Sequence, residues 1–301
     1  MKNWRRWLKI GLLLLPGAAA AGEAARQPGE GQEVLPLDGL ADPARWQPSE
    51  CSLSVAADNR AAGQPTLHLQ IPVDYHAGEA KYPIGWPRLY CALRSGVERS
   101  WADYDRFEFM ILAKASRETL PRSPLNLQVH CPQRPDSTDV NLTQIKLNEW
   151  VLVSLPTAEI RQVDRVAQLG FNISESNYQD KDLLDFYIGA FRLVRSVECR
   201  VERLTVKAPA IFADRATVLV ELVVAGPPAR VSRGVPFTLR GGERVLRLET
   251  LPVRRGAQTL AVEVTELRLA PGEYSLTAFD ADPQRRQSAT FKVVESPWRE
   301  P

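Results

Sequence analysis

Apolar and polar residues alternate along most of the chain after about residue 35. In TLHLQIPV (66–73), Leu67, Leu69 and Ile71 alternate with His68 and Gln70. The same two-residue period runs through DRFEFMIL (105–112) and LNLQVHC (125–131). Because successive side chains of a strand point to opposite faces, these segments predict strands of sheets that are apolar on one face only.

Helical periodicity is nearly absent. The one short candidate is TAEIRQVDRVAQL (157–169), whose apolar residues recur about every three positions, as on one side of a short helix or 3₁₀ turn. DFYIGAFRLV (185–194) is apolar on both faces, which predicts a strand at the centre of a sheet rather than at its edge. The fold class that these patterns predict is all-β.

A second series of strand-like segments follows residue 216. It comprises TVLVELVV, PFTLR, RVLRLET, QTLAVEVTEL, GEYSLTAF and SATFKVVE, with Gly or Pro between most of them. Short strands at this spacing, with no helix between them, predict a second and smaller β-sandwich. We therefore expect a first sandwich over 35–206, a second over 207–296 with the boundary between Val206 and Thr217, and a loose tail over 297–301.

The first 21 residues have the order of a secretory signal. Lys2, Arg5, Arg6 and Lys9 precede the apolar run IGLLLLPGAAAA, which ends in small residues. The apolar run is too short to span a bilayer unaided, and an uncleaved membrane anchor is the competing interpretation. Residues 22–34 are rich in Gly, Ala, Gln and Glu without apolar periodicity, which predicts a flexible leader. The expected location is secreted or periplasmic.

Removal of the signal changes the charge balance. Four of the 38 basic residues lie in it, so 34 basic residues oppose 36 acidic residues and the remaining chain has a formal charge of −2. A chain without excess positive charge is not attracted electrostatically to nucleic acid or to an anionic membrane surface. Neither partner is expected.

The four cysteines are Cys51, Cys91, Cys131 and Cys199, all within the first predicted sandwich. An even number in an exported chain predicts two disulfides, for which three pairings are possible. A metal site is the alternative, but no CxxC or CxxH spacing supports one.

Motifs for catalysis are missing from the sequence. It has three histidines and no GxSxG elbow, HExxH, P-loop or dinucleotide-binding glycine pattern. Thiol nucleophiles are not expected where all four cysteines can pair. A convergent carboxylate pair for glycoside cleavage is the third-ranked alternative, because 36 acidic residues always offer some pairs. We therefore expect no enzyme.

The stretch YPIGWPRLY (82–90) concentrates aromatics, prolines and an arginine in a loop between two predicted strands. A rigid ring can stack on the C–H face of a pyranose while nearby polar groups bind its hydroxyls. Candidate ligand-binding residues here are Tyr75, Tyr82, Trp86 and Arg88. The alternative is that these rings close the open end of the sandwich as core residues.

A second candidate site consists of polar side chains that alternate with the predicted core, namely His68, Gln70, Asn126, Gln128 and His130. Amides and imidazoles both donate and accept hydrogen bonds, so these residues would line a sugar-binding groove if their two strands share a concave sheet. The alternative is an ordinary solvated sheet face. Expected core residues at strand starts are Trp46, Trp101 and Trp150.

The order of four landmarks resembles the final strands of the galactose-binding-like jelly-roll sandwiches, which include many carbohydrate-binding modules. The landmarks are WADYDRFEFMILA, LNEWVLVSLP, IRQVDRVAQLGFNI and DFYIGAFRLV. The resemblance covers rather more than half the chain and is strongest to versions found beside glycoside hydrolases in secreted bacterial proteins. The C-terminal region resembles immunoglobulin-like or fibronectin-like domains through LAPGEYSLTAFD, a generic match.

The resemblance carries further expectations. First and last strands are neighbours in such folds, which implies a Cys51–Cys199 disulfide and leaves Cys91 to pair with Cys131. It also favours a core position for Trp86, because a GWP turn there looks like part of the fold. Relatives often hold a structural calcium, but Gly189 replaces an acidic residue of their last strand. We therefore expect no calcium and no other cofactor, although Asp38, Asp42 and Asp185 could still supply oxygen ligands.

The function that the sequence predicts is non-catalytic recognition of a polysaccharide or glycoconjugate by an exported two-domain protein. The rival is an interaction or structural protein whose sandwich binds another protein. An exposed aromatic site would favour sugar, and a broad flat apolar patch would favour protein.

Overall fold

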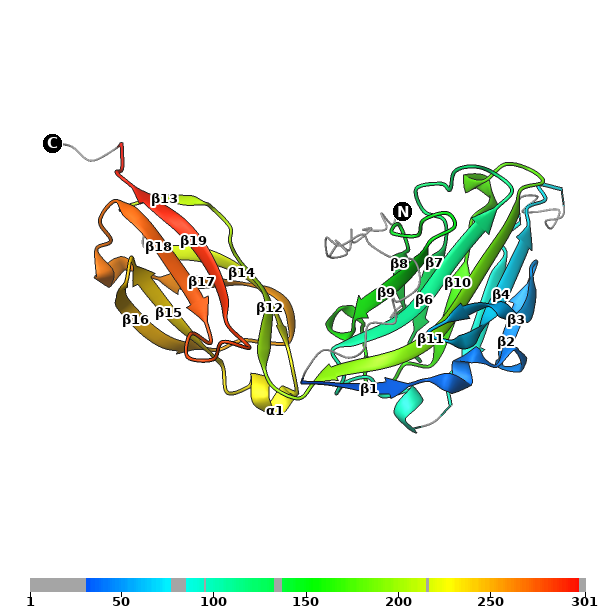
Figure 1. The fold of residues 1–301 in the computed structure, drawn as a ribbon, viewed down its shortest axis with the longest axis horizontal. Coiled ribbons are helices and arrows are strands. Elements are labelled where there is room, and N and C mark those ends of the chain that lie inside the picture. Colours follow the sequence, from blue (N-terminus) through cyan, green and yellow to red (C-terminus); the bar gives the residue numbers. More distant parts are fainter. Residues whose placement is uncertain (1–30, 77–84, 95, 133–136, 215–216, 298–301) are drawn as a thin grey trace, which may run out of the picture.

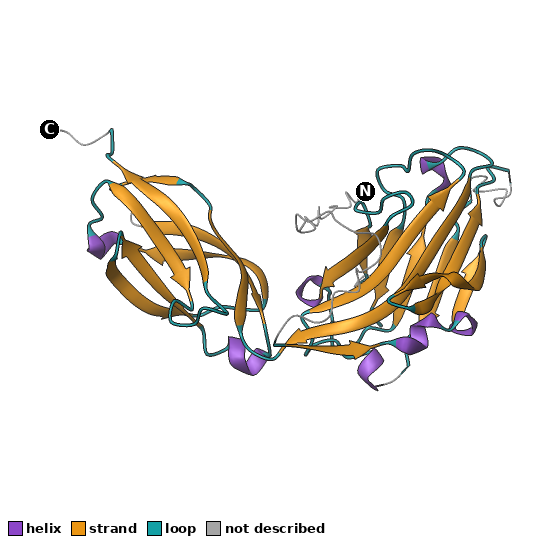
Figure 2. Cartoon of the chain, in the orientation of Figure 1, coloured by secondary structure: helices purple, strands orange, loops and turns teal. Residues whose placement is uncertain are grey.

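The structure is a computed structural model that describes residues 31–76, 85–94, 96–132, 137–214 and 217–297. Figure 1 shows two bodies built of strands, and Figure 2 shows how little of the chain is helical. The protein is all-β, as the alternation predicts. The predicted signal over 1–21 lies outside the described residues. Within the described ranges, no helix is long and apolar enough to cross a membrane.

The first body is a sandwich of two antiparallel sheets, here called sheet 1 and sheet 2. Sheet 1 has the order β3-β4-β11-β6-β9, with β1 also paired to β11. Its strands are β1 (Gln32–Pro36), β3 (Ser52–Ala61), β4 (Gln64–Pro72), β6 (Arg106–Ala115), β9 (Trp150–Pro156) and β11 (Leu183–Ser196). Sheet 2 has the order β2-β5-β10-β7-β8. Its strands are β2 (Trp46–Ser49), β5 (Arg88–Ala92), β7 (Asn126–His130), β8 (Thr138–Asn141) and β10 (Gln168–Asn172).

The apolar sides of the two sheets share one core. Leu67 and Leu69 of sheet 1 are at most 1% exposed, as are Leu127 and Val129 of sheet 2, and all four belong to the same cluster. The two-residue alternation therefore places the predicted core residues correctly. It also fixes the polar residues between them on the outer faces of the sandwich.

Two of the three tryptophans expected in the core are there. Trp46 and Trp101 are fully or almost fully buried. The expectation for Trp150 is wrong, because it pairs with Leu112 on the outward side of sheet 1 and is only half-buried. A residue at the start of a strand can face either way, and here the register with β6 decides.

DFYIGAFRLV forms most of β11, which lies between β4 and β6 at the centre of sheet 1, as predicted. A bulge between Gly189 and Arg192 interrupts its pairing with β6, and Ala190 has φ 53° there. β1 pairs with the second half of β11, so residues 32–34 belong to a sheet. The prediction of a flexible leader is wrong for these residues, since an edge strand needs no apolar periodicity of its own to be held by backbone hydrogen bonds.

Helical turns are short. They are η1 (Asp38–Ala41), η2 (Pro43–Arg45), η3 (Gly96–Glu98), η4 (Thr157–Glu159), η5 (Glu175–Asn177), η6 (Thr265–Leu267) and α1 (Pro228–Val231). The segment predicted as a short helix or 3₁₀ turn begins with the 3₁₀ turn η4 and continues as non-helical turns into β10.

The second body is a smaller sandwich of two sheets, with the strand orders β12-β14-β17 and β13-β19-β18-β15-β16. Its strands are β12 (Arg200–Val206), β13 (Ala210–Phe212), β14 (Thr217–Ala225), β15 (Val235–Gly241), β16 (Arg244–Leu251), β17 (Gly256–Glu263), β18 (Gly272–Ala278) and β19 (Gln287–Val294). All six predicted strands of this region are present. Its immunoglobulin-like character stays a prediction.

The predicted boundary between Val206 and Thr217 is wrong. β12 precedes it and β14 follows it, yet the two strands pair with each other. Val201 and Leu204 of β12 are buried in the second core. The chain passes from one sandwich to the other between the end of β11 and the start of β12, at residues 197–199.

The predicted disulfides are also wrong, because all four cysteines are thiols. Cys199 belongs to the second core and Cys51 packs against the first. Cys91 lies on β5 and Cys131 follows β7, and β10 lies between those two strands. Two inter-strand spacings amount to about 10 Å, which exceeds the Cα separation that a disulfide bridges.

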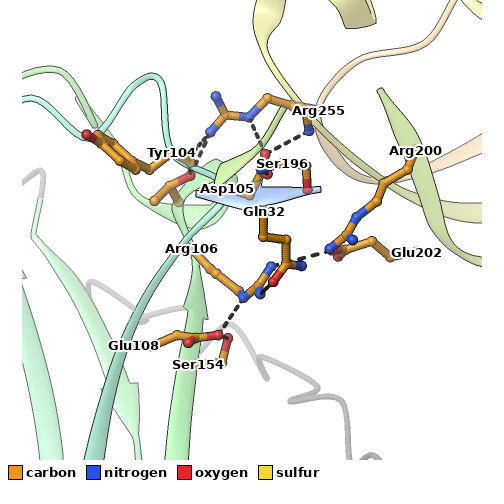
Figure 3. A network of polar contacts seen from close by, with 12 residues as sticks. Gln32, Tyr104, Asp105, Arg106, Glu108, Ser154, Ser196, Arg200, Glu202 and Arg255 are labelled. Carbon is orange, nitrogen blue, oxygen red and sulfur yellow. Dashed lines mark hydrogen bonds and ion pairs between the residues drawn. The ribbon is translucent and has the colours of Figure 1, made fainter. Parts of the chain in front are cut away.

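The two sandwiches are joined by buried polar contacts that Figure 3 shows. Asp105, just before β6, accepts hydrogen bonds from the backbone N–H of Ser196 (2.7 Å) and of Gly226 in the second sandwich (2.8 Å). Arg255, just before β17, lies 3.6 Å from the same carboxylate. The exposed fractions of the two side chains are 6% for Asp105 and 14% for Arg255.

Arg255 also donates to backbone and hydroxyl oxygens of the first sandwich. Its acceptors are the carbonyls of Ala102 and Tyr104 and, at 2.7 Å, the hydroxyl of Thr157. Burial lowers the pKa of Arg255 from its ordinary value, but guanidinium groups stay protonated in proteins. One side chain of the second sandwich therefore contacts two segments of the first, the loop before β6 and the start of η4.

Replacing Arg255 should destabilise the protein strongly. In Arg255→Met, Asp105 keeps its burial and its two backbone donors but loses its cationic partner, and removing one partner of a buried ion pair costs about 3 kcal/mol or more. The free energy of unfolding, measured by urea denaturation, should fall by that amount. Arg254→Met is the matched control, because the Arg254 side chain is exposed. Equal stabilities of the two variants would contradict a stabilising role for the Arg255–Asp105 contact.

The thiol assignment predicts how the cysteines react. Unreduced protein dissolved in guanidinium chloride should titrate with Ellman's reagent as four thiols per chain. Native protein should react slowly, because burial raises the pKa of Cys51, Cys91 and Cys199 and the thiolate is the reactive form. Detection of only two thiols, or of none, would show that disulfides form after all.

Candidate functional site

The outward side of sheet 2 carries most of the polar side chains that the sequence suggests for ligand binding. In β7, Leu127 and Val129 point into the core, so Asn126, Gln128 and His130 point outward. We call this outward surface of β5, β10 and β7, together with Trp86 beside β5, the sheet-2 face.

Antiparallel register arranges the outward residues in rows across the strands. One row, from β5 to β8, is Arg88, Asn172, Asn126 and Asn141. The next row is Tyr90, Gly170, Gln128 and Asp139. Residues directly opposite each other in such rows are close enough for their side chains to interact. The sheet-2 face is thus a continuous array of amides with one aromatic ring at its centre.

The ring of Tyr90 lies over Gly170. A Cβ atom at position 170 would be 2.5 Å from Tyr90 Cε1, so only glycine allows the ring to occupy this place. The Tyr90 hydroxyl donates to Gln128 Oε1 at 3.1 Å, and Gln128 Nε2 donates to Asp139 Oδ1 at 2.9 Å. These contacts hold both side chains down along the sheet.

His130 lies beside this ring. Its ring centroid is 5.7 Å from that of Tyr90 in an edge-on arrangement, and its Nδ1 is 2.7 Å from the Ser137 hydroxyl. An aromatic pair with a hydrogen-bonded imidazole is a rigid element of the face.

Trp86 stands at the edge of the face and is 49% exposed. Its indole Nε1–H donates to Asn172 Oδ1 at 3.3 Å, and the guanidinium of Arg88 lies 5.5 Å from the ring centroid. The indole is therefore oriented by an amide of the sheet while much of its apolar surface stays in contact with solvent.

Two neighbouring amide atoms of the face are buried without a hydrogen-bond partner among the described residues. They are Nδ2 of Asn172 and Oδ1 of Asn126, whose residues are directly paired across β10 and β7. One is a donor and the other an acceptor, and buried polar atoms without partners are costly. A hydroxyl group both donates and accepts, so it is the kind of group that matches such a pair.

The backbone on either side of Trp86 is held by two carboxylates. Glu175 of η5 accepts from the Gly85 N–H at 2.9 Å and from the Asp74 N–H at 3.3 Å. Glu50, in the turn between β2 and β3, accepts from the Trp86 N–H at 2.6 Å. Glu175 is only 3% exposed, and this burial raises the pKa of its carboxyl group above the ordinary 4.5.

The candidate residues in and near the aromatic loop lie in different environments. The core position that the resemblance favours for Trp86 is wrong, because the indole is half exposed. Tyr75 is half-buried against the core, and its hydroxyl donates to the carbonyl of Tyr178 rather than facing the sheet-2 face. Tyr82 lies outside the described residues. Arg88 does lie on the face, 3.9 Å from Glu50.

The five polar residues of the second predicted site do not share a sheet. His68 and Gln70 lie on β4 of sheet 1, whereas Asn126, Gln128 and His130 lie on β7 of sheet 2. The outer faces of a sandwich point in opposite directions, so the combined groove is wrong. His68 Nε2 and Gln70 Nε2 both contact Asp185 Oδ1, at 2.7 and 2.9 Å.

The carboxylates considered for calcium do not assemble into a site. Asp185 contacts His68 and Gln70, and Asp42 accepts from the Ala44 N–H at the start of η2. Among the described residues, no group of three or more acidic, histidine or cysteine side chains is arranged to hold a metal ion.

Sequence reasoning missed the central part of the face. Tyr90, Gly170 and Asn172 were not among the candidates, nor were Glu50 and Glu175. Tyr90 could have been predicted from the sequence. RLYCA alternates so that Leu89 and Cys91 point into the core, which leaves Tyr90 on the outward side. Gly170 and Asn172 needed the register of β10, and the two glutamates needed contacts over 36 and 90 residues of sequence.

No family model matches the sequence, and no curated protein matches it. Among solved structures, the chain is similar to a β-1,2-glucanase from Parabacteroides distasonis, with 12% identity over 84% of this chain and a TM-score of 0.37. It spans 37% of the length of that glucanase.

Two solved carbohydrate-binding modules are also similar. One is a CBM28 module specific for non-crystalline cellulose, with 14% identity, coverage of 50% of this chain and 86% of that one, and a TM-score of 0.32. The other is a xylan-binding domain of CBM22, with 12% identity, coverage of 56% and 97%, and a TM-score of 0.31. At TM-scores below 0.5, these likenesses assign neither a function nor a ligand.

The exposure of Trp86 predicts that its ring contributes little to folding. Trp86→Ala should lower the free energy of unfolding by about 1 kcal/mol, the scale of the hydrogen bond that its indole donates to Asn172. Trp101→Ala should lower it by about 3–5 kcal/mol, because that ring is fully buried. Urea denaturation of both variants checks the contrast. A loss at Trp86 as large as at Trp101 would mean that the ring closes the core.

Proposed function

We propose that this chain is a non-catalytic carbohydrate-binding protein and that the sheet-2 face binds a polysaccharide or glycoconjugate. The observation that carries the proposal is the exposed Trp86 indole, held beside a buried amide donor and a buried amide acceptor that have no partner among the described residues. Sugars present an apolar C–H face next to hydroxyls that both donate and accept. Ring and amides together fit this combination.

The rest of the face supports an extended ligand. Trp86 and Tyr90 are four residues apart in sequence, and four residues at the rise of a strand span about 13 Å. Amides and an imidazole line the rows between and beside the two rings. A ligand contacting both aromatic residues would be longer than one sugar ring.

Two carboxylates, those of Glu50 and Glu175, lie beside the sheet-2 face. Oε2 of Glu50 and Oε2 of Glu175 would each be 2.7 Å from a Cβ at Gly85, so the two groups lie close together. Each accepts a backbone N–H, and Glu175 is buried. Our proposal therefore gives these groups a structural role and includes no bond cleavage.

An exported location is part of the proposal. It is supported by the sequence of basic, apolar and small residues over 1–21 and by the near-neutral charge of the remainder. A polysaccharide or cell-surface glycoconjugate is met outside the cytoplasm, so location and ligand agree.

A protein partner is the second candidate function, and one observation favours it. β16 is an edge strand of the second sandwich, and its Leu248 and Val245 are 72% and 47% exposed. Edge strands with exposed apolar side chains are sites where another chain can add. This surface lies in the other sandwich, so it does not compete with the sheet-2 face.

Binding should depend on the sheet-2 face alone. In native affinity gels containing hydroxyethyl cellulose, soluble xylan or other soluble polysaccharides, and on a glycan array, Trp86→Ala should weaken binding about tenfold or more. Gly170→Ala should also weaken it, because the new methyl group displaces the Tyr90 ring. Gln70→Ala, a polar change on the opposite face, should bind like the parent protein. Equal loss in all three variants, or no binding to any glycan, would refute the assignment.

A further inference from the structure

Glu175 is the first residue of η5, three residues after β10, and it binds two backbone segments at once. One oxygen accepts from the Gly85 N–H at 2.9 Å and the other from the Asp74 N–H at 3.3 Å. The residue is 3% exposed, so the carboxylate has exchanged water for these donors. Both oxygens of a carboxylate are good acceptors while it is ionised.

Glu50 completes the arrangement from another element. It accepts from the N–H of Trp86, the residue after Gly85, so two consecutive backbone donors are bound by two different carboxylates. Position 85 has no room for a side chain, because a Cβ there would lie 2.7 Å from an oxygen of each glutamate. The path of the backbone into Trp86 is therefore fixed by these contacts together with the indole bond to Asn172.

We propose that Glu175 is a positioning residue for Trp86, and that ligand affinity at the sheet-2 face falls when mild acid protonates it. This inference rests on the proposed function for its binding consequence. Its structural consequence, a change in how Trp86 is held, does not depend on any ligand. Among the described residues, the hydrogen bonds of Glu175 go to backbone N–H groups, so it acts on the indole through the backbone.

Protonation changes the number of acceptors. The protonated group keeps one accepting oxygen, while its hydroxyl oxygen carries a hydrogen and is a poor partner for the second N–H. The Gly85 and Asp74 donors then compete for one acceptor, and the backbone before Trp86 loses a constraint. The loss of one such hydrogen bond corresponds to a change in affinity of about fivefold.

Burial determines the pH range and the sign of the stability effect. Desolvation is the largest cause that raises the pKa of Glu175 above 4.5, and the neighbouring negative charges of Glu50 and Asp74 add to it. In the unfolded chain the carboxyl has its ordinary pKa, so ionisation of the buried group costs folding free energy as pH rises. Acidification through the raised pKa therefore does not unfold the protein through this group. Protonation of Glu175 therefore weakens binding without a loss of stability through this group.

Other charged groups surround this carboxylate. Arg88 of β5 lies 3.9 Å from Glu50, Lys181 before β11 contacts Asp74 at 2.7 Å, and the His76 N–H donates to Asp74. Lys181 lowers the pKa of Asp74. A substitution at Glu175 is needed to separate its titration from those of the neighbouring groups.

The experiment follows the indole N–H of Trp86 by NMR in the purified protein without ligand. The peak is assigned by its loss in Trp86→Phe, and it should move with a single titration whose pKa lies above 4.5. Glu175→Gln has one accepting oxygen, like the protonated acid, so its peak should resemble the acid form at pH 7 and should not move. Glu149→Gln, which removes an exposed carboxylate elsewhere, should titrate like the parent protein.

Affinity gels with hydroxyethyl cellulose and soluble xylan provide the second readout. Affinity at pH 7 should fall about fivefold in Glu175→Gln, the scale of one hydrogen bond, and its pH profile should be flat. If the NMR titration is as expected but no polysaccharide binds, the positioning role stands and the proposed function fails. If polysaccharide binds and neither the peak nor the affinity responds to Glu175→Gln, the positioning role fails and the proposed function stands.

Discussion

The register of β10 between β5 and β7 is the constraint on which the sheet-2 face depends. Leu169 and Phe171 are fully buried in the first core, so Gly170 and Asn172 have to face outward. A shift of one residue would exchange the two sets and bury polar groups in the core. With the register fixed, Gly170 lies under the Tyr90 ring, and Asn172 lies between Arg88 and Asn126. The chemistry of the face thus follows from hydrophobic burial on the other side of the same strands.

Local sequence patterns correctly predicted most of the strands and of the residues that face the core. Alternation in 66–73 and 125–131 identified strands and their inward residues, and the apolar run of β11 identified a central strand. The same patterns say nothing about which strands are neighbours. His68 and Asn126 each lie between core leucines in similar local sequences, yet they lie on opposite faces of the sandwich. The alternation in β12 likewise does not indicate whether that strand belongs to the first or the second sandwich. The cysteine pairing failed for the same reason, since strand order decides which thiols can meet.

Exposed aromatic residues were the hardest to predict, because their environment is made by distant segments. Pro83 and Pro87 indicated a stiff turn around Trp86, but a stiff turn can point a ring inward or outward. The direction is set by Asn172, Glu50 and Glu175, which come from three other parts of the chain. Asn172 had no signal beyond its place in GFNI. A glutamate buried against backbone donors looks in sequence like any other glutamate.

Under the proposed function, the contact of Arg255 with Asp105 would also determine how copies of the protein behave on a polymer. A flexible hinge lets neighbouring binding units adjust to any spacing of sites, whereas a joint held by buried contacts allows only a narrow range of distances and directions. Consider several copies that are anchored through their second sandwiches. Once one copy has bound a glycan chain, the effective concentration of the next sheet-2 face at that chain depends on how rigidly Arg255 and Asp105 hold the two sandwiches together. Avidity would then discriminate between polymers of different stiffness that each sheet-2 face binds equally well.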